Sequence, residues 1–365
     1  MIKMKELTIG NLTAKIPIIQ GGMGVGISLS GLASAVANQG GIGVISAAGI
    51  GMLEPDLHTN YIEANNRAFK NGIQKTRQKT NGIFGVNIMV AMSNFSDMAK
   101  IAIDEGIDII FSGAGLPLNL PAFLNGSRKT KLVPIVSSGR AAKIITKRWI
   151  EKYDYIPDAI VVEGPMAGGH LGFKEEQLNN PNYSLECIVP DVIHELSFFE
   201  EKSKKPIPVI AAGGIYTGED IYNIMQLGAS GVQMATRFVT TDECDASVAF
   251  KNCYITAKKE DIVIIKSPVG MPGRAIQNQY IIDVTAGEKK PYTCPYHCIK
   301  TCNYQDSPYC ISLALMNAKM GLLENGFVFA GANAYRANEI ISVQQLMESL
   351  EKEYADAAAL QNIVK

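Results

Sequence analysis

The sequence has little of what would mark a nucleic-acid-binding, membrane or secreted protein. Its 34 Lys and Arg are balanced by 35 Asp and Glu, so the formal net charge is −1, and no block of one sign stands out. This balance speaks against nucleic acid or a membrane surface as a partner. No apolar run approaches the roughly 18 residues of a membrane helix, and residues 1–15 lack the apolar core of a signal peptide. We therefore expect a cytoplasmic protein with reduced cysteines.

Several catalytic signatures are missing as well. The chain has only four histidines, none in a His-Glu-x-x-His motif, and no Ser or Cys nucleophile with an evident His and Asp partner. Paired carboxylates of the kind that glycosidases use do not occur at the ends of the predicted strands. These absences argue against the commonest hydrolase classes.

What the sequence does contain is a regular series of short apolar runs. Eight of them have the character of strands, and most are separated by segments with helical periodicity. They cover residues 16–20, 41–47, 82–90, 107–113, 131–137, 159–164, 207–214 and 231–237. Eight strands alternating with helices predict an α/β fold of the (β/α)8 TIM-barrel type, and an open doubly wound sheet is the alternative.

The barrel pattern stops at residue 237. We predict a barrel over residues 1–237 and an appended, mostly helical C-terminal segment over residues 238–365, whose packing on the barrel is left open. This segment contains a cysteine-rich stretch at residues 292–310.

The most distinctive stretch covers residues 159–173. An apolar run at residues 159–162, typical of a buried parallel strand, is followed by the glycine-rich residues 163–172, which include His170. Glycine lets backbone approach a ligand closely, and histidine readily moves protons near neutral pH. Because chemistry in a barrel is placed at the C-terminal ends of strands, His170 is a candidate acid–base residue. An ordinary loop histidine is the alternative.

Two later strand ends resemble phosphate sites. Gly213 and Gly214 close the seventh predicted strand, and Ala235 and Thr236 close the eighth. Barrels often bind a phosphate there through backbone N–H groups. Glycine turns without a ligand are the alternative.

Four of the seven cysteines are close in sequence: Cys294, Cys298, Cys302 and Cys310. In a reducing compartment such a cluster suggests zinc or an iron–sulfur cluster. The spacing fits neither the usual zinc pairs nor the ferredoxin runs, and a loop with free thiols is the alternative.

Several of these motifs together resemble the nitronate monooxygenase (2-nitropropane dioxygenase) family, which also includes FMN-dependent enoyl-ACP reductases of type II. The resemblance lies in residues 20–24, 40–43, 85–87, 163–172, 211–215, 233–238 and 331–334. It implies a (β/α)8 barrel that binds FMN and acts as an oxidoreductase, oxidising alkyl nitronates to a carbonyl compound and nitrite. The alternative that it implies is an NAD(P)H-dependent enoyl-ACP reductase. Residues 173–176 lack the Thr-containing continuation that we associate with the reductases, which favours the nitronate reading.

The resemblance also assigns residues and partners. His170 matches the family's catalytic base, which draws a proton from the carbon that bears the nitro group. The residues expected to bind FMN are Gly22, Met23, Gly24, Asn87, Ser137, Glu163, Gly168, Gly169, Gly213, Gly214, Gln233, Ala235 and Thr236. The expected partners are a small-molecule substrate and either oxygen or NAD(P)H, and a homodimer is one open alternative for the oligomeric state.

Overall fold

The central element of the fold is a sheet of eight parallel strands. The computed structural model describes residues 2–288, 290, 292–294 and 296–364. The strands follow one another around the sheet in the order β3, β11, β10, β8, β7, β6, β5, β4. Their bounds are β3 (Ile18–Gln20), β4 (Gly43–Ser46), β5 (Phe84–Asn87), β6 (Ile109–Ser112), β7 (Lys131–Val136), β8 (Ile160–Glu163), β10 (Val209–Ala212) and β11 (Gly231–Met234).

The two ends of this sheet meet, which makes it a barrel. Ile19 of β3 forms a parallel bridge with Ile42, just before β4. The Gln20 N–H donates to the Ile42 carbonyl at 2.9 Å, and the Ile42 N–H donates to the Ile18 carbonyl at 3.0 Å. The predicted (β/α)8 barrel is therefore confirmed, and all eight predicted strands are present.

Alternate strand residues fill the barrel interior, as the period of two requires. Val44, Phe111 and Val161 belong to this inner cluster and are at most 1% exposed. The antiparallel hairpin of β1 (Leu7–Ile9) and β2 (Leu12–Ala14) adds its own apolar side chains to the same cluster. The hairpin thus closes the N-terminal end of the barrel and leaves the C-terminal end for a site.

Helices surround the barrel and bury one apolar face each against it. They are α1 (Ser30–Asn38), α2 (Tyr61–Lys79), α3 (Phe95–Asp104), α4 (Gly139–Tyr153), α5 (Leu185–Ser203), α6 (Gly218–Gln226) and the last helix, α11 (Val343–Val364). Two of these helices begin at residues that cap them. Ser138 caps α4, and Thr217 with Asp220 forms a capping box at α6.

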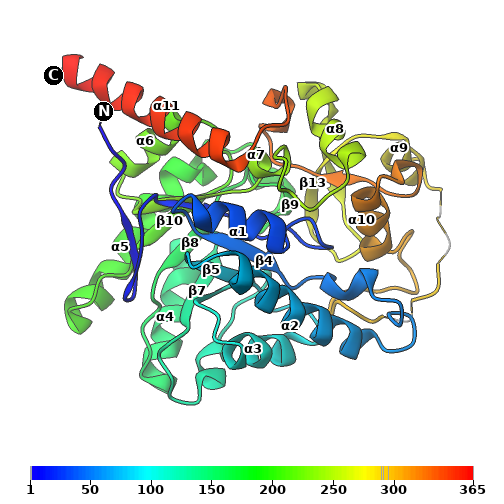
Figure 1. Ribbon diagram of the computed structural model, residues 1–365, viewed down its shortest axis with the longest axis horizontal. Coiled ribbons are helices and arrows are strands. Elements are labelled where there is room, and N and C mark those ends of the chain that lie inside the picture. Colours follow the sequence, from blue (N-terminus) through cyan, green and yellow to red (C-terminus); the bar gives the residue numbers. More distant parts are fainter. Residues whose placement is uncertain (1, 289, 291, 295, 365) are drawn as a thin grey trace.

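The last helix returns to the barrel wall. Figure 1 shows α11 beside α6, and the Gly218 N–H at the start of α6 donates to Glu353 Oε2 of α11 at 2.7 Å. α11 also packs against α1, so it fills the gap between α6 and α1. The division at residue 237 stays a prediction, and α11 shows that the chain beyond it contributes to the wall.

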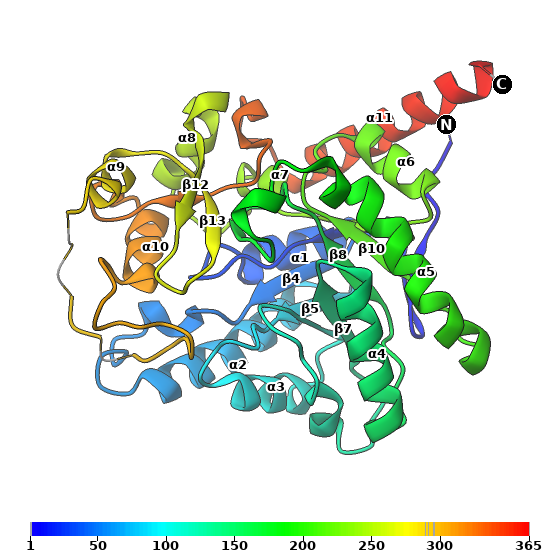
Figure 2. The ribbon, with the colours of Figure 1, turned by 180° about the vertical axis from the view of Figure 1, so that it is seen from behind.

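Between β11 and α11 the chain forms a layer over the C-terminal end of the barrel. Its helices are α7 (Thr236–Val239), α8 (Val248–Thr256), α9 (Gln279–Thr285) and α10 (Ile311–Met320). It also holds a small antiparallel sheet of β12 (Ile262–Lys266), β13 (Pro272–Ile276) and β14 (Val328–Phe329). Figure 2 shows β12 and β13 beside α10, at the end of the molecule away from α5. The segment is mostly helical, as predicted, with this sheet as an addition.

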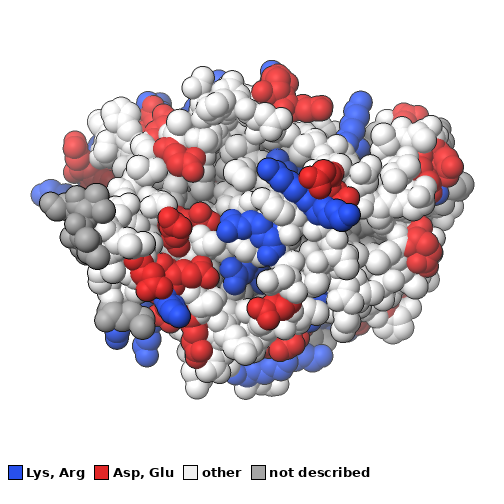
Figure 3. Space-filling view, turned by 90° about the horizontal axis from the view of Figure 1, so that it is seen from above, with Lys and Arg blue, Asp and Glu red and all other residues white. Residues whose placement is uncertain are grey.

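The surface charge and the character of the helices agree with the expectations from the sequence. On the face in Figure 3, basic and acidic side chains are interspersed. Among the helices of the described residues, none has the length and apolar character that a membrane span needs.

Candidate functional site

A cavity of about 490 Å³ lies at the C-terminal ends of the barrel strands. This volume is in the range of small-molecule and cofactor sites, about 300–1,000 Å³. Its lining includes His170 and every residue that the family resemblance assigned to FMN, from Gly22 to Thr236. The structure thus brings together residues from six strand ends, while their roles stay predictions.

The loop that carries His170 is held in place from two sides. The buried Arg274 of β13 donates through Nη1 to the carbonyls of Pro165, at 2.7 Å, and Ala167, at 2.5 Å. On the other side, Ser137 Oγ at the end of β7 donates to the Gly172 carbonyl at 3.1 Å. The loop therefore has a fixed path although it is rich in glycine.

Two of the loop residues form a strand that joins the layer over the C-terminal end of the barrel, called the upper layer below. β9 (Gly169–His170) pairs antiparallel with β13, with His170 opposite Gly273 and Gly169 opposite Arg274. Glycine is required on this path, because a Cβ on Gly168 would lie 2.5 Å from the backbone of Ala330 and Gly169 has φ +75°. No local signal in the sequence predicts this pairing.

His170 is a neutral imidazole with defined contacts. Its Nε2 lies 2.7 Å from Ser267 Oγ, and its ring packs edge-on against Phe329 with centroids 5.0 Å apart. Burial lowers the pKa of His170 to about 4, since a low-dielectric surrounding disfavours the charged form. At neutral pH the ring therefore has an unprotonated nitrogen that can accept a proton.

Glu163, at the end of β8, lines the same cavity and is shifted in the opposite sense. Burial raises the pKa of Glu163 to about 7. Near neutral pH its carboxyl is thus partly protonated and able to donate a hydrogen bond. Two titratable groups moved toward their neutral forms in one cavity are typical of an active site.

The corner predicted to bind phosphate is built from backbone with little side chain. Gly213 and Gly214 have φ of +89° and +90°, and the Asn333 Nδ2 donates to the Gly214 carbonyl at 2.6 Å. A Cβ on Gly331 would lie 2.6 Å from Thr236 Oγ1. These glycines leave a cradle that side chains would fill, as a bulky polar group requires.

The loop after β3 forms another wall of the cavity. A Cβ on Gly22 would lie 2.5 Å from Asn87 Cβ, so the turn passes directly over the end of β5. The Met23 N–H donates to Ser28 Oγ at 2.8 Å, which fixes the turn. A flat ring fits against such a bare backbone wall.

A further wall, which sequence reasoning missed, comes from the cysteine segment, here residues 296–310. Ile299 bridges to Met92 in the loop after β5, and the Ser93 N–H donates to the Cys298 carbonyl at 3.1 Å. Cys298 and Thr301 line the cavity. The segment therefore crosses the cavity instead of forming a separate unit.

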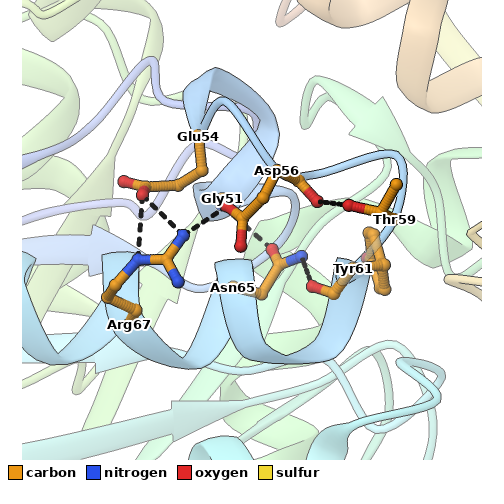
Figure 4. A network of polar contacts seen from close by, with 7 residues as sticks. All are labelled: Gly51, Glu54, Asp56, Thr59, Tyr61, Asn65 and Arg67. Atoms are coloured by element: carbon orange, nitrogen blue, oxygen red, sulfur yellow. Dashed lines mark hydrogen bonds and ion pairs between the residues drawn. The ribbon is translucent and has the colours of Figure 1, made fainter.

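The loop between β4 and α2 supports this crossing. Arg67 of α2 pairs with Glu54 and Asp56, and Asn65 Oδ1 accepts from the Gly51 N–H at 3.0 Å. Figure 4 shows the members of this network: Gly51, Glu54, Asp56, Thr59, Tyr61, Asn65 and Arg67. The network holds the start of α2, where Tyr61 lines the cavity and packs against the ring of Tyr296 in the cysteine segment, 5.5 Å between centroids.

The structure does not support the predicted zinc or iron–sulfur site. Among the described residues, which include Cys294, Cys298, Cys302 and Cys310, no group of three or more His, Cys, Asp or Glu could hold a metal ion. The chain from 296 to 300 is irregular and not helical, with His297 at φ +43°, so a spacing of four residues does not put the thiols on one helix face. Cys298 Sγ instead lies 3.3 Å from Ser312 Oγ, and burial raises the pKa of Cys298.

Comparisons with known proteins agree with this geometry. A family model described as nitronate monooxygenase matches residues 5–353. A "probable nitronate monooxygenase" of Staphylococcus saprophyticus is 28% identical over 303 residues, which cover 77% of this chain and 81% of that protein.

Solved structures are similar over nearly the whole chain. FabK from Thermotoga maritima has a TM-score of 0.75 at 28% identity and covers 96% of each chain. A nitroalkane oxidase from Streptomyces ansochromogenes has a TM-score of 0.73 at 21% identity, covers 95% of this chain and 97% of that one, and shares the fold.

The raised pKa of Glu163 predicts a pH-dependent stability. The folded-state value of about 7 lies above the ordinary 4.5, so the folded form binds more protons between these values. Glu163 therefore contributes stability that is complete below about pH 4.5 and is lost as the pH rises through about 7. The free energy of unfolding of the wild type minus that of Glu163→Gln should therefore fall by on the order of 2 kcal/mol between about pH 5 and pH 8. Urea unfolding of both proteins at both pH values measures this difference. His170 is present in both proteins, so its titration contributes equally to each. A difference that does not change with pH would contradict the raised pKa of Glu163.

Proposed function

The chain belongs to the nitronate monooxygenase family and is an oxidoreductase, and from this premise we propose that it binds FMN and oxidises alkyl nitronates to a carbonyl compound and nitrite. The observation that carries the proposal is that His170 and all the residues expected to bind FMN line one cavity. FMN, when bound, supplies the electron-accepting ring system that this oxidation requires.

The residues present fit such a cofactor. Gly213, Gly214 and Thr236 would hold the phosphate, where the missing side chains leave a cradle. Gly22 and Met23 would lie along the ring system, beside Asn87. Seven of the thirteen lining residues assigned to FMN are Gly or Ala, which supports a ligand that lies close against the backbone.

The chain's own residues account for the proton chemistry. When the substrate is a neutral nitroalkane, a proton leaves the carbon that bears the nitro group and is accepted by the neutral ring of His170, which leaves the nitronate anion. Ser267 and Phe329 hold the ring in one orientation. Glu163 in its neutral form places no negative charge beside that anion. A preformed nitronate needs no proton removal.

The first test is the identity of the cofactor and reaction. Protein purified without oxygen should show a flavin spectrum and release FMN on heating. With propane-2-nitronate it should consume oxygen and yield nitrite and acetone. NAD(P)H consumption with a crotonyl thioester, and no nitrite, would instead support the enoyl reductase. A colourless protein that takes up no FMN would contradict the proposal.

Replacing His170 should separate the two forms of the substrate. For His170→Asn we expect turnover of neutral 2-nitropropane to fall by about 10²- to 10⁴-fold, the usual contribution of a general base. Turnover of the preformed nitronate should fall by less than about tenfold. Nitrite release with each substrate measures this. His194→Asn, at an exposed position of α5, is the matched control and should change neither rate. Equal losses on both substrates would remove the base assignment.

Replacing Asn333 should weaken the binding of FMN without removing a group that takes part in the reaction. Its amide supports the Gly214 carbonyl, so Asn333→Ala should raise the FMN dissociation constant about tenfold, the loss of roughly one hydrogen bond. Quenching of flavin fluorescence by the apoprotein measures the affinity. Asn317→Ala removes a comparable bond, Asn317 Nδ2 to the Asn325 carbonyl at 3.0 Å, in α10. An equal effect of both variants would count against the role of Asn333.

A further inference from the structure

The part of the cavity beyond the strand ends has an apolar wall. It is formed by the loops after β5 and β6, the turn between β12 and β13, the cysteine segment and α10. Its main side chains are Met89, Met92, Leu116, Met271, Ile299 and Leu315. We call this set the outer wall. None of its members was assigned to FMN, so it is free to contact the rest of the substrate.

In the described part of the chain, the cavity has no cationic side chain that could pair with a carboxylate on the substrate, a second negative charge beside that of the nitronate group. Among the lining residues that the structure describes there is no Lys, Arg or Asp. The acidic or basic side chains that line the cavity at the strand ends are Glu163 and His170. Lys300 of the cysteine segment directs its Nζ to the Val90 carbonyl, at 3.3 Å, and does not line the cavity. A substrate carboxylate would lose its water there without gaining a cation, which is costly.

Methionine is unusually frequent in the lining. Met23, Met89, Met92, Met166, Met234 and Met271 all contribute. Methionine is flexible and polarizable, so it adapts to apolar groups of different shape and does not select a single one. The outer wall should therefore accept a series of chain lengths with gradually changing affinity.

We propose that the outer wall makes the enzyme selective for nitronates that carry an uncharged apolar chain, and that it discriminates against nitronates with a carboxylate. The inference rests on the proposed function and adds the substrate class. It follows from the apolar side chains of the wall and from the lack of a lining cation in the described residues.

A chain-length series tests the apolar part. With the nitronates of nitroethane, 1-nitrobutane and 1-nitrohexane, kcat/KM should rise on the order of threefold per methylene, as burial of a methylene predicts. Propionate 3-nitronate should be at least about 100-fold poorer than the nitronate of 3-methyl-1-nitrobutane, whose isopropyl end matches the carboxylate in shape. A flat series, or equal use of these last two compounds, would overturn the inference.

A cation placed in the wall tests the charge part. Thr301 lines the cavity from an exposed position, so a longer side chain is tolerated there. Thr301→Lys should raise kcat/KM for propionate 3-nitronate about tenfold and leave its isopropyl analogue within about twofold. Thr301→Gln, similar in length and uncharged, should raise neither. No gain for the carboxylate in T301K would contradict the charge argument.

Ligand binding without turnover separates this inference from the proposed function. Hexanol and hexanoate are titrated against the FMN-loaded protein, and the shift of its visible spectrum reports binding. Hexanol should bind at least about tenfold more tightly. Equal binding, in a protein that oxidises nitronates, overturns only the inference. Tighter hexanol binding, in a protein that oxidises no nitronate, supports the outer wall and overturns the proposed function.

Discussion

The arrangement of the cavity depends on the pairing of β9 with β13. Through this pairing, two residues from the loop after β8 become part of a sheet that otherwise belongs to the upper layer. The buried Arg274 strengthens it by donating to two carbonyls of the same loop. Because backbone groups buried in this position need partners, the loop cannot take another path without leaving them unsatisfied. His170 is therefore positioned by a strand far along the chain.

The same pairing explains why His170 is neutral. Ser267 and Phe329, which contact its ring, both come from the upper layer. An open barrel would leave the ring in water with an ordinary pKa. The layer keeps water from the His170 ring, and the pKa of His170 falls. Burial at the end of β8 raises the pKa of Glu163. One cause, burial, thus moves an acid and a base in opposite directions, and the layer sets the chemistry that the barrel end alone could not.

The elements predicted from the sequence are those with local signals. Apolar runs closed by glycine gave the eight strands, because a strand buried on both faces needs such a run. Gly213 was predicted because it closes an apolar run, and Gly331 lies in a stretch that carries the family resemblance. In the structure neither position has room for a Cβ. The residues that the sequence did not reveal act over long separations. Ser267 lies 97 positions from His170, and no periodicity links the two.

The cysteine segment shows why a local pattern can mislead. Four cysteines close in sequence suggest a metal site, and a spacing of four residues puts Cys294, Cys298 and Cys302 on one face if the backbone is helical. Here residues 296–300 are not helical, and Ile299 and its neighbours bond to the loop after β5. These tertiary contacts set the backbone path, and among the described residues the four cysteines form no group that could hold a metal ion. What this segment provides to the site is apolar surface facing the cavity, so its contribution is to the shape and polarity of the cavity that the barrel opens.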